Sequence, residues 1–310
     1  MLSTDDIRFF TVVAQARSLA DAARSLDVSP PAVSIRLRGL EQRLGVQLIN
    51  RSSRRLILTD EGELLARRGR ALIEDTAKLT DDLLARRGMI AGNLRILAPL
   101  GFGRRFIGPA AAAFQAKHPA AKVELTLSDR LGRAAADSWD IMIHIGALKD
   151  STLRMARLAP NERYLVGSPA YLKRHGAPDE PGDLHRHACL ALRENDEDVT
   201  LWRFTRDRGR RPPDIVRIEP KLASNDGDVV KAWSLAGIGL MLRSEWDVAD
   251  DLRSGRLVRL LPDYRLPNAD VVALLNPDGG GRARRTQAFL DMLAAMLAGP
   301  PWRSTAKAKG

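Results

Sequence analysis

The residue types that could carry out catalysis or hold a metal gather between Ser168 and Cys189. His185, His187 and Cys189 alternate along the chain, and His175 lies ten residues before the first of them. Zinc sites combine ligands from separate parts of a chain, and this cluster lacks a distant fourth ligand. Ser168 precedes a proline and lies outside the Gly-x-Ser-x-Gly pattern of a hydrolase nucleophile. The sequence therefore predicts no metal, no cofactor and no catalytic residue, and an enzyme of a small organic acid stays as an alternative.

Arginines near the amino terminus indicate a different chemistry, the binding of a polyanion. Residues 1–59 hold nine arginines and five acidic residues, and the whole chain has a formal net charge of +11. Such a charge favours nucleic acid as the partner. Residues 51–55, Arg-Ser-Ser-Arg-Arg, form a basic turn between two short apolar runs. A turn of this kind is well suited to contact phosphates. A second basic excess, in residues 282–310, is expected to be a frayed, solvated tail.

Three short helices are predicted before the basic turn. Ser3 or Thr4 can cap the first, and Ser18 with Asp21 resembles a capping box for the second. Ser29 is placed to cap the third, which begins at Pro30 and ends before Gly45. The second and third helices, joined by a tight turn at residues 27–29, have the pattern of a helix-turn-helix.

The third helix has a buried and an exposed face. Its buried stripe consists of Val33, Leu37, Leu40 and Leu44. Spacing at 100° per residue directs four side chains away from this stripe and Arg36 to its flank; the four are Pro31, Ser34, Ile35 and Arg38. We expect this face to enter a major groove, with the basic turn forming a wing beside it.

A long helix is predicted to follow, over residues 60–88, with Thr59 as its cap. Leu65, Leu72 and Leu79 repeat every seven residues, and Leu83 follows four residues later. This spacing is typical of a short coiled-coil seam, so we expect a second copy of the chain to cover it. Gly88 and Gly92 mark the expected hinge to the next domain.

From Asn93 onward strands alternate with helices, which predicts an α/β domain with a largely parallel sheet. Strands are expected at residues 94–98, 122–127, 139–145 and 221–224. Ligands of open α/β sheets bind at the carboxyl ends of strands. The residues expected to line one crevice there are Leu100, Gly101, Ser128, His144, Ile145, Asn225 and Asp226. Two helices begin among them, which favours a small carboxylate as the ligand.

With these residues in place, the chain resembles a LysR-type transcriptional regulator. The segment SLADAARSLDVSPPAVSIRLRGLEQRLGVQLINRSSRRLILTDEG is similar to the amino-terminal signature of that family. Segments such as GNLRILAPLGFGRRFIGP, WDIMIHIG and GDVVKAWSLAGIGLMLRSEW resemble the effector domain of a branch that includes regulators related to those of D-malate and tartrate utilisation. The resemblance covers residues 1 to about 298.

The resemblance implies an α/β protein with an N-terminal winged helix-turn-helix at residues 1–59 and a dimerising linker helix at residues 60–90. Residues 91–310 would form a two-lobed, Rossmann-like effector domain resembling type 2 periplasmic binding proteins. Lobe I would comprise residues 91–163 and 268–298, and lobe II residues 164–267.

The same resemblance implies which residues contact DNA. Base contacts are implied for Pro30, Pro31, Ser34 and Ile35, next to Ser29 at the start of the helix. Phosphate contacts are implied for Arg36, Arg38, Arg51, Ser52 and Arg54. Two positions depart from the family pattern: Ile35 stands where arginine or lysine is usual, and Ile49 stands where phenylalanine is usual. The loss of charge at Ile35 leaves the operator sequence open.

The implied partners are a double-stranded DNA operator, a small anionic effector and further copies of the chain, as a dimer or tetramer. RNA polymerase is a further candidate partner. No export signal and no membrane-spanning stretch is recognised, so a cytoplasmic location is expected. The alternative of a solute-binding protein fused to a DNA-binding domain of unrelated use stays open; salt-sensitive binding to a two-fold operator favours the regulator.

Overall fold

The computed structural model describes residues 1–50, 56–85, 89–131, 139–146, 154–194, 199–206, 212–275 and 283–303. Two compact units are present, one mainly of residues 1–88 and the other of residues 89–277 and 284–310. Among these described residues, no helix combines the length and apolar character needed to cross a membrane.

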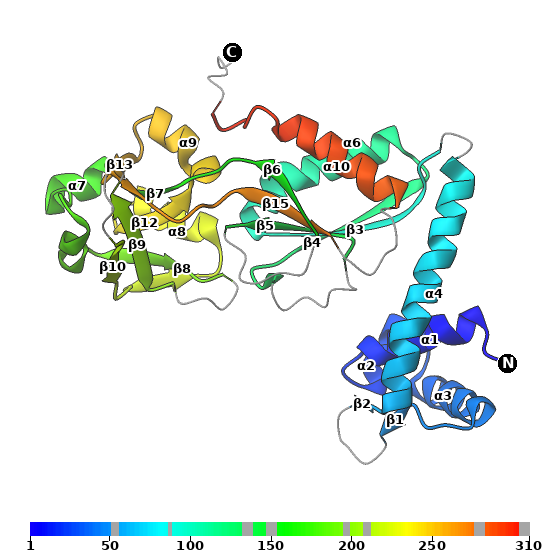
Figure 1. Ribbon diagram of the computed structural model, residues 1–310. Coiled ribbons are helices and arrows are strands. Elements are labelled where there is room, and N and C mark those ends of the chain that lie inside the picture. The colour runs from blue at the N-terminus through cyan, green and yellow to red at the C-terminus, as the bar shows by residue number, and fades with distance from the viewer. Residues whose placement is uncertain are drawn as a thin grey trace. The chain divides into compact units, whose positions relative to one another are not determined.

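The amino-terminal unit is built from three short helices, a two-stranded wing and one long helix (Figure 1). Its elements are α1 (Thr4–Gln15), α2 (Leu19–Ser25), α3 (Pro30–Leu44), β1 (Ile49–Asn50), β2 (Ile57–Leu58) and α4 (Asp60–Ala85). β1 and β2 pair antiparallel, with Ile49 opposite Leu58. The core contains Phe10, Val13, Leu37, Leu40 and Leu48.

Local capping explains where these helices begin and end. The Ser3 side chain accepts a hydrogen bond from the Asp6 backbone, in a complete capping box, and the Ser18 side chain accepts one from the Asp21 backbone. The Thr59 hydroxyl accepts one from the Gly62 amide at the start of α4. α3 ends at Gly45, whose φ of +72° is the left-handed conformation that glycine adopts most readily.

The first lobe of the second unit is a five-stranded sheet with helices packed on it. The strand order is β4-β3-β5-β15-β6, from β3 (Gly92–Ala98), β4 (Ala121–Leu127), β5 (Ile141–Ile145), β6 (Arg154–Ala159) and β15 (Val271–Leu275). β3 is parallel to β4 and β5, whereas β15 is antiparallel to β5 and β6. Helices α6 (Gly108–Lys117) and α10 (Arg284–Leu297) lie on one face of this sheet (Figure 1).

The second lobe contains another five-stranded sheet and a smaller antiparallel one. The order β11-β8-β12-β7-β13 is formed by β7 (Arg163–Gly167), β8 (Cys189–Leu192), β11 (Leu222–Ser224), β12 (Leu240–Ser244) and β13 (Val258–Leu260). The smaller sheet has the order β10-β9-β14, from β9 (Leu201–Arg206), β10 (Asp214–Arg217) and β14 (Tyr264–Arg265). The helices are α7 (Pro169–His175), the 3-10 helix η4 (Pro181–Arg186), α8 (Gly227–Leu235) and α9 (Glu245–Arg253).

Two chain crossings join the lobes and make both larger sheets mixed rather than largely parallel. The chain passes from β6 to β7 through residues 160–162 and returns from β14 to β15 through residues 266–270. β7 and β15 are entered directly from the other lobe without a helical crossover, and each runs antiparallel to its neighbours. Asn161 joins the two crossings. Its side-chain amide donates to the Ala269 carbonyl at 2.7 Å, and its backbone amide donates to the Asp270 carboxylate.

Candidate functional site

The outward face of α3 presents the side chains expected to contact DNA. Ser29, Pro30, Pro31 and Arg38 are exposed, Ser34 is half-buried, and the side chain of Ile35 is 64% exposed. Ser29 occupies the cap position of α3, but its side chain makes no capping hydrogen bond, in contrast to the expectation. The face of α3 therefore presents the exposed aliphatic side chain of Ile35 beside Ser34 and Arg38.

Two of the three arginines of α3, Arg36 and Arg38, are held differently. Arg36 donates to the Asp5 carbonyl at 3.2 Å, and its guanidinium lies 4.5 Å from the centre of the Phe9 ring. Arg38 donates to the carbonyl of Ser34, which lies one turn earlier in the same helix, at 3.3 Å. Arg36 thus lies against α1 at the flank of the helix, while Arg38 stays with the outward face.

A buried glutamate positions the wing, and sequence reasoning missed it. The Glu41 carboxylate accepts hydrogen bonds from the backbone amides of Leu48 at 2.9 Å and Ile49 at 3.4 Å. A charged residue inside an otherwise apolar helical stripe was the only signal for this role. Three predicted phosphate-contacting residues of the wing lie outside the described residues: Arg51, Ser52 and Arg54.

The long helix α4 carries an exposed row of leucines. Leu72, Leu79 and Leu83 are each more than half exposed, whereas Leu65 packs against the core of the amino-terminal unit. Close packing of α4 on α1 depends on Gly69, because a Cβ atom there would lie 2.6 Å from Ile7. Leu65, at one end of the predicted seam, is therefore covered by this chain itself. Leu72, Leu79 and Leu83 form an exposed apolar stripe on α4.

A cleft of about 380 Å³ lies between the two lobes of the second unit. This volume falls in the usual range for small-molecule sites. Of the seven residues expected at a crevice, four line it: Gly101, Ser128, His144 and Ile145. Leu100, Asn225 and Asp226 are not among the lining residues. The carboxyl ends of β4 and β5 thus contribute as expected, and the start of α8 contributes Gly227 instead.

Asn225 and Asp226 bridge the lobes rather than line the cleft. Asn225 donates to Asp129 at 2.8 Å, and the Asp226 carboxylate accepts from Arg104 at 3.3 Å. The same Asp226 carboxylate accepts from the Asp228 amide at 2.8 Å and so caps α8. An anion is therefore already present at the amino terminus of α8, and it belongs to the chain itself.

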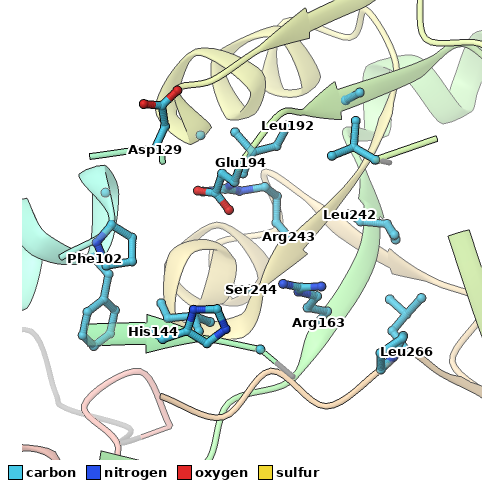
Figure 2. Close-up of a pocket in the computed structure, with 18 of the residues that line it drawn as sticks. Phe102, Asp129, His144, Arg163, Leu192, Glu194, Leu242, Arg243, Ser244 and Leu266 are labelled. Carbon is cyan, nitrogen blue, oxygen red and sulfur yellow. The ribbon is translucent and has the colours of Figure 1, made fainter. Parts of the chain in front are cut away.

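Lobe II contributes charged cleft residues that the sequence analysis did not identify. Figure 2 shows Glu194, Arg163 and Arg243 around the cleft, opposite Asp129 and Phe102. Arg243 lies near the carboxyl end of β12, and Glu194 lies just beyond β8, so the rule of strand carboxyl ends could have found both. Arg163 begins β7, which runs antiparallel to β12, so that rule points away from it.

Arg243 is fixed by a buried carboxylate that it shares with a lysine. Asp247 accepts from Arg243 Nε at 2.8 Å and Nη2 at 2.6 Å, and from Lys231 Nζ at 2.6 Å. Burial alone would raise the pKa of Asp247, but the charges of Arg243 and Lys231 hold this pKa below its usual value. Asp247 therefore stays ionised in the folded chain and presents Arg243 to the cleft in one orientation.

Arg163 and His144 lie on the same side of the cleft. Figure 2 shows the guanidinium of Arg163 turned toward the side on which His144 lies. A Cβ atom on Gly146, two residues after His144, would lie 3.3 Å from Nη2 of Arg163. His144 of β5 and Arg163 at the start of β7 therefore line the same part of the cleft, and together with Ser128 they offer hydrogen-bond donors to a carboxylate.

A π-helical turn joins lobe I to lobe II beside the cleft. This turn, η1 (Gly103–Ile107), follows α5 (Leu100–Phe102), and its consecutive residues Arg104 and Arg105 both reach lobe II. Arg104 pairs with Asp228 at 2.6 Å, and Arg105 pairs with Asp250 at 2.5 Å. π-Helical turns are frequent at functional sites.

Aromatic rings complete this joint between the lobes. Phe102 of lobe I and Trp246 of lobe II meet edge to face with ring centres 5.3 Å apart, and both also line the cleft. Gly101 makes this approach possible, because a Cβ atom there would lie 3.0 Å from the Trp246 ring. A ligand in the cleft would therefore touch the same residues that set the position of the lobes.

The histidine and cysteine cluster is part of the packing of lobe II. The Tyr171 hydroxyl lies 3.3 Å from His187 Nδ1 and accepts from the Ala188 amide at 2.8 Å. Burial raises the pKa of the Cys189 thiol to about 12. Within the described part of the chain, no group of three or more histidine, cysteine or acidic residues is placed to hold a metal ion.

Two family descriptions match almost the whole chain. Residues 4–63 match the bacterial regulatory helix-turn-helix proteins of the lysR family, and residues 87–298 match the LysR substrate binding domain. The chain is 36% identical over 263 residues to the HTH-type transcriptional regulator DmlR of Escherichia coli K12, covering 85% of each protein. It is 32% identical over 259 residues to the HTH-type transcriptional activator TtdR of the same strain, covering 84% of this chain and 83% of TtdR.

Solved full-length structures show the same architecture. The Vibrio cholerae virulence activator AphB superposes with a TM-score of 0.59 at 25% identity, covering 95% of this chain and 99% of AphB. CrgA, a regulator from Neisseria meningitidis, superposes with a TM-score of 0.59 at 27% identity, covering 96% of this chain and 99% of CrgA.

Proposed function

This chain belongs to the LysR family of transcriptional regulators, and we propose that a small carboxylate binds in its interlobe cleft and controls its binding to DNA. The family, the α/β fold class and the DNA-binding regulatory function expected from the sequence are confirmed by these matches. The relatives are regulators rather than enzymes, so the enzyme alternative is set aside.

The observation that carries the carboxylate proposal is the set of donors around the cleft. Arg163 of β7 and Arg243 of β12 are permanently charged, and both line the cleft from lobe II. His144 and Ser128 add donors from lobe I. Asp247 holds Arg243 in place, so one cationic group is oriented before a ligand arrives. Preorganised charge of this kind favours a compact anion over a neutral ligand.

The acidic residues of the cleft limit which anions fit. Asp129 and Glu194 also line it, and Asp129 is engaged by Asn225. These oxygens accept hydrogen bonds from hydroxyl groups. A hydroxylated small carboxylate therefore matches the cleft better than an unsubstituted one. D-Malate and tartrate are the first probes, because the relatives' branch is associated with their use.

The amino-terminal unit is proposed to bind a two-fold operator as a dimer or a dimer of dimers. The apolar stripe of Leu72, Leu79 and Leu83 would be covered by α4 of a second copy. Ser29, Pro30, Pro31, Ser34 and Ile35 would face bases, and Arg36, Arg38, Arg51, Ser52 and Arg54 would face phosphates. RNA polymerase is proposed as a further partner at the promoter, and the cytoplasm as the place of action.

Calorimetry of the full chain tests the carboxylate proposal. D-Malate and tartrate are titrated into wild type, and the corresponding diamides serve as matched neutral ligands. We expect binding of at least one acid and none of its diamide. Arg163→Gln should weaken this binding at least ten-fold, whereas Lys173→Gln, on the exposed face of α7, should leave it unchanged. Equal binding of acid and diamide, or equal effects of the two variants, would contradict the proposal.

Filter binding over a salt series tests the DNA part. About six to ten phosphate contacts per complex give an affinity loss of roughly 10³–10⁵ between 50 and 200 mM salt. Arg51→Ala with Arg54→Ala should weaken binding to all sequences alike, because phosphate contacts carry no sequence information. A complex whose affinity did not change with salt would contradict this part.

A further inference from the structure

The chain continues past the end of the family match and packs there instead of fraying. The match to the LysR substrate binding domain ends at residue 298, and α10 ends at Leu297. Residues 300–303 form a turn in which the Arg303 amide donates to the Pro300 carbonyl at 2.8 Å. The side chain of Trp302 is only 2% exposed. The expectation of a frayed tail from residue 282 onward is therefore wrong for residues 284–303.

Trp302 packs against Phe102, one of the aromatic residues that line the cleft. Its ring is 5.4 Å from that of Phe106 and 6.2 Å from that of Phe102, both edge to face. Phe102 and Phe106 in turn pack against Trp246 of lobe II, at 5.3 and 6.0 Å. Aromatic rings in such arrangements supply large, directional contacts. Trp302 thus completes a four-ring cluster whose members come from lobe I, lobe II and the carboxyl-terminal segment.

Arg303 ties the same segment to lobe II and to the first crossing. It donates to the Glu245 carboxylate through Nη2 at 2.6 Å and through Nε at 2.8 Å. Glu245 begins α9, and its amide donates to the Glu162 carbonyl at 2.7 Å. The Trp302 carbonyl accepts from Arg253 at the end of α9 at 3.1 Å. One short segment therefore holds both ends of α9.

We propose that residues 299–303 form a third connection between the lobes, a carboxyl-terminal strap, and that Trp302 and Arg303 position the cleft-lining rings of Phe102 and Trp246. α10 anchors the strap in lobe I, and Glu245 with Arg253 anchors it in lobe II. Neither Trp302 nor Arg303 lines the cleft, so their effect on a ligand is transmitted through Phe102 and Trp246. The part of this proposal that concerns ligand affinity rests on the proposed function.

Two truncated chains form a matched pair for the test. One ends at Gly299 and lacks the strap; the other ends at Arg303 and lacks only residues 304–310. Hydrogen exchange is measured by mass spectrometry on the full-length chain and on both truncated chains. Without the strap, we expect exchange about ten-fold faster in η1, in α9 and at residues 160–162, with β3 and β12 unchanged. The chain ending at Arg303 should behave as the full-length chain.

Point variants separate positioning from general stabilisation. Trp302→Ala and Arg303→Gln should reproduce the faster exchange, while Trp302→Phe and Arg303→Lys should restore most of the protection. With D-malate or tartrate as the probe, the dissociation constant should rise about ten-fold without the strap at a temperature where the chain stays folded.

Two results would overturn the strap. One is unchanged exchange at the joint in the chain ending at Gly299; the other is equal acceleration throughout the second unit, which indicates a merely stabilising segment. If neither probe binds wild type, the proposed function fails, while the exchange comparison still decides the strap.

Discussion

Replacing Asp247 by asparagine removes the carboxylate that two cations share inside lobe II. The side chain of Asp247 is 1% exposed and receives both Lys231 and Arg243. Removing one partner of a buried ion pair leaves uncompensated charge and costs about 3–5 kcal/mol. Lys231 keeps the exposed carboxylate of Asp228 at 4.0 Å. We therefore expect Asp247→Asn to lower the free energy of unfolding of this unit by about 3 kcal/mol, the low end of that range.

Urea unfolding followed by tryptophan fluorescence measures this loss. All five tryptophans lie between residues 139 and 302, so the signal reports the second unit alone. Asp228→Asn is the control, because Asp228 approaches the same lysine and pairs with Arg104 but is 54% exposed. An exposed pair contributes about 0–1 kcal/mol. If both variants lower the unfolding free energy equally, the ion pairs of Asp247 with Lys231 and Arg243 do not stabilise the fold as their burial indicates.

The pH dependence of stability gives an independent check on Asp247. Because its pKa is lower in the folded chain than in the unfolded one, the folded state favours the ionised form. This contribution is fully present above the unfolded value of 3.8 and is lost as the pH falls through the folded value. Wild type should therefore lose more stability than Asp247→Asn on acidification below pH ~4. Parallel stability curves would contradict this reasoning.

Three further predictions concern other parts of the chain. Ile35 is expected to contact a thymine methyl group, so Ile35→Ala should cost about 1 kcal/mol at that site, and Ile35→Arg should steepen the salt slope by about one unit. Replacing each operator thymine by uracil checks this contact; unchanged binding at every position would make Ile35 a bystander. His144 is expected to hold a bound carboxylate only when protonated, so effector affinity should fall between pH 6 and pH 8 and His144→Arg should flatten the change; calorimetry with equal wild-type affinities at both values would refute the charge role. Cys189, whose pKa burial raises to about 12, should resist iodoacetamide in the native chain and react after unfolding; rapid labelling of the native protein would show that the thiol is accessible.

Local signals made the amino-terminal unit predictable from the sequence. Ser3, Ser18, Thr59 and Gly45 act within one turn of their own helices, so their types and spacing sufficed. The same holds for Ser128, which follows β4 directly, and for Gly101, which comes shortly after the end of β3. Ser29 was placed correctly at the start of α3, yet its missing capping bond depends on the rotation of one side chain, which spacing does not fix.

Contacts between segments far apart in the chain could not be predicted from the sequence pattern. Arg163 lines the cleft because the chain enters β7 from the other lobe, against the direction of its neighbours. Asp226 meets Arg104 across 122 positions. Trp302 meets Phe106 only once both lobes and the end of the chain are assembled. Such pairings are set by the tertiary arrangement, and neither helical nor strand periodicity carries information about them.

Coupling between the two ligands tests the central claim most directly. An operator is selected from random DNA with the full chain, and its dissociation constant is measured by fluorescence anisotropy with and without a saturating carboxylate found by calorimetry. We predict a change of at least about five-fold in wild type, the low end of common allosteric coupling, and no change in Arg163→Gln at the same ligand concentration. A DNA affinity that stays constant in wild type while the carboxylate occupies the cleft would contradict control of DNA binding by the cleft.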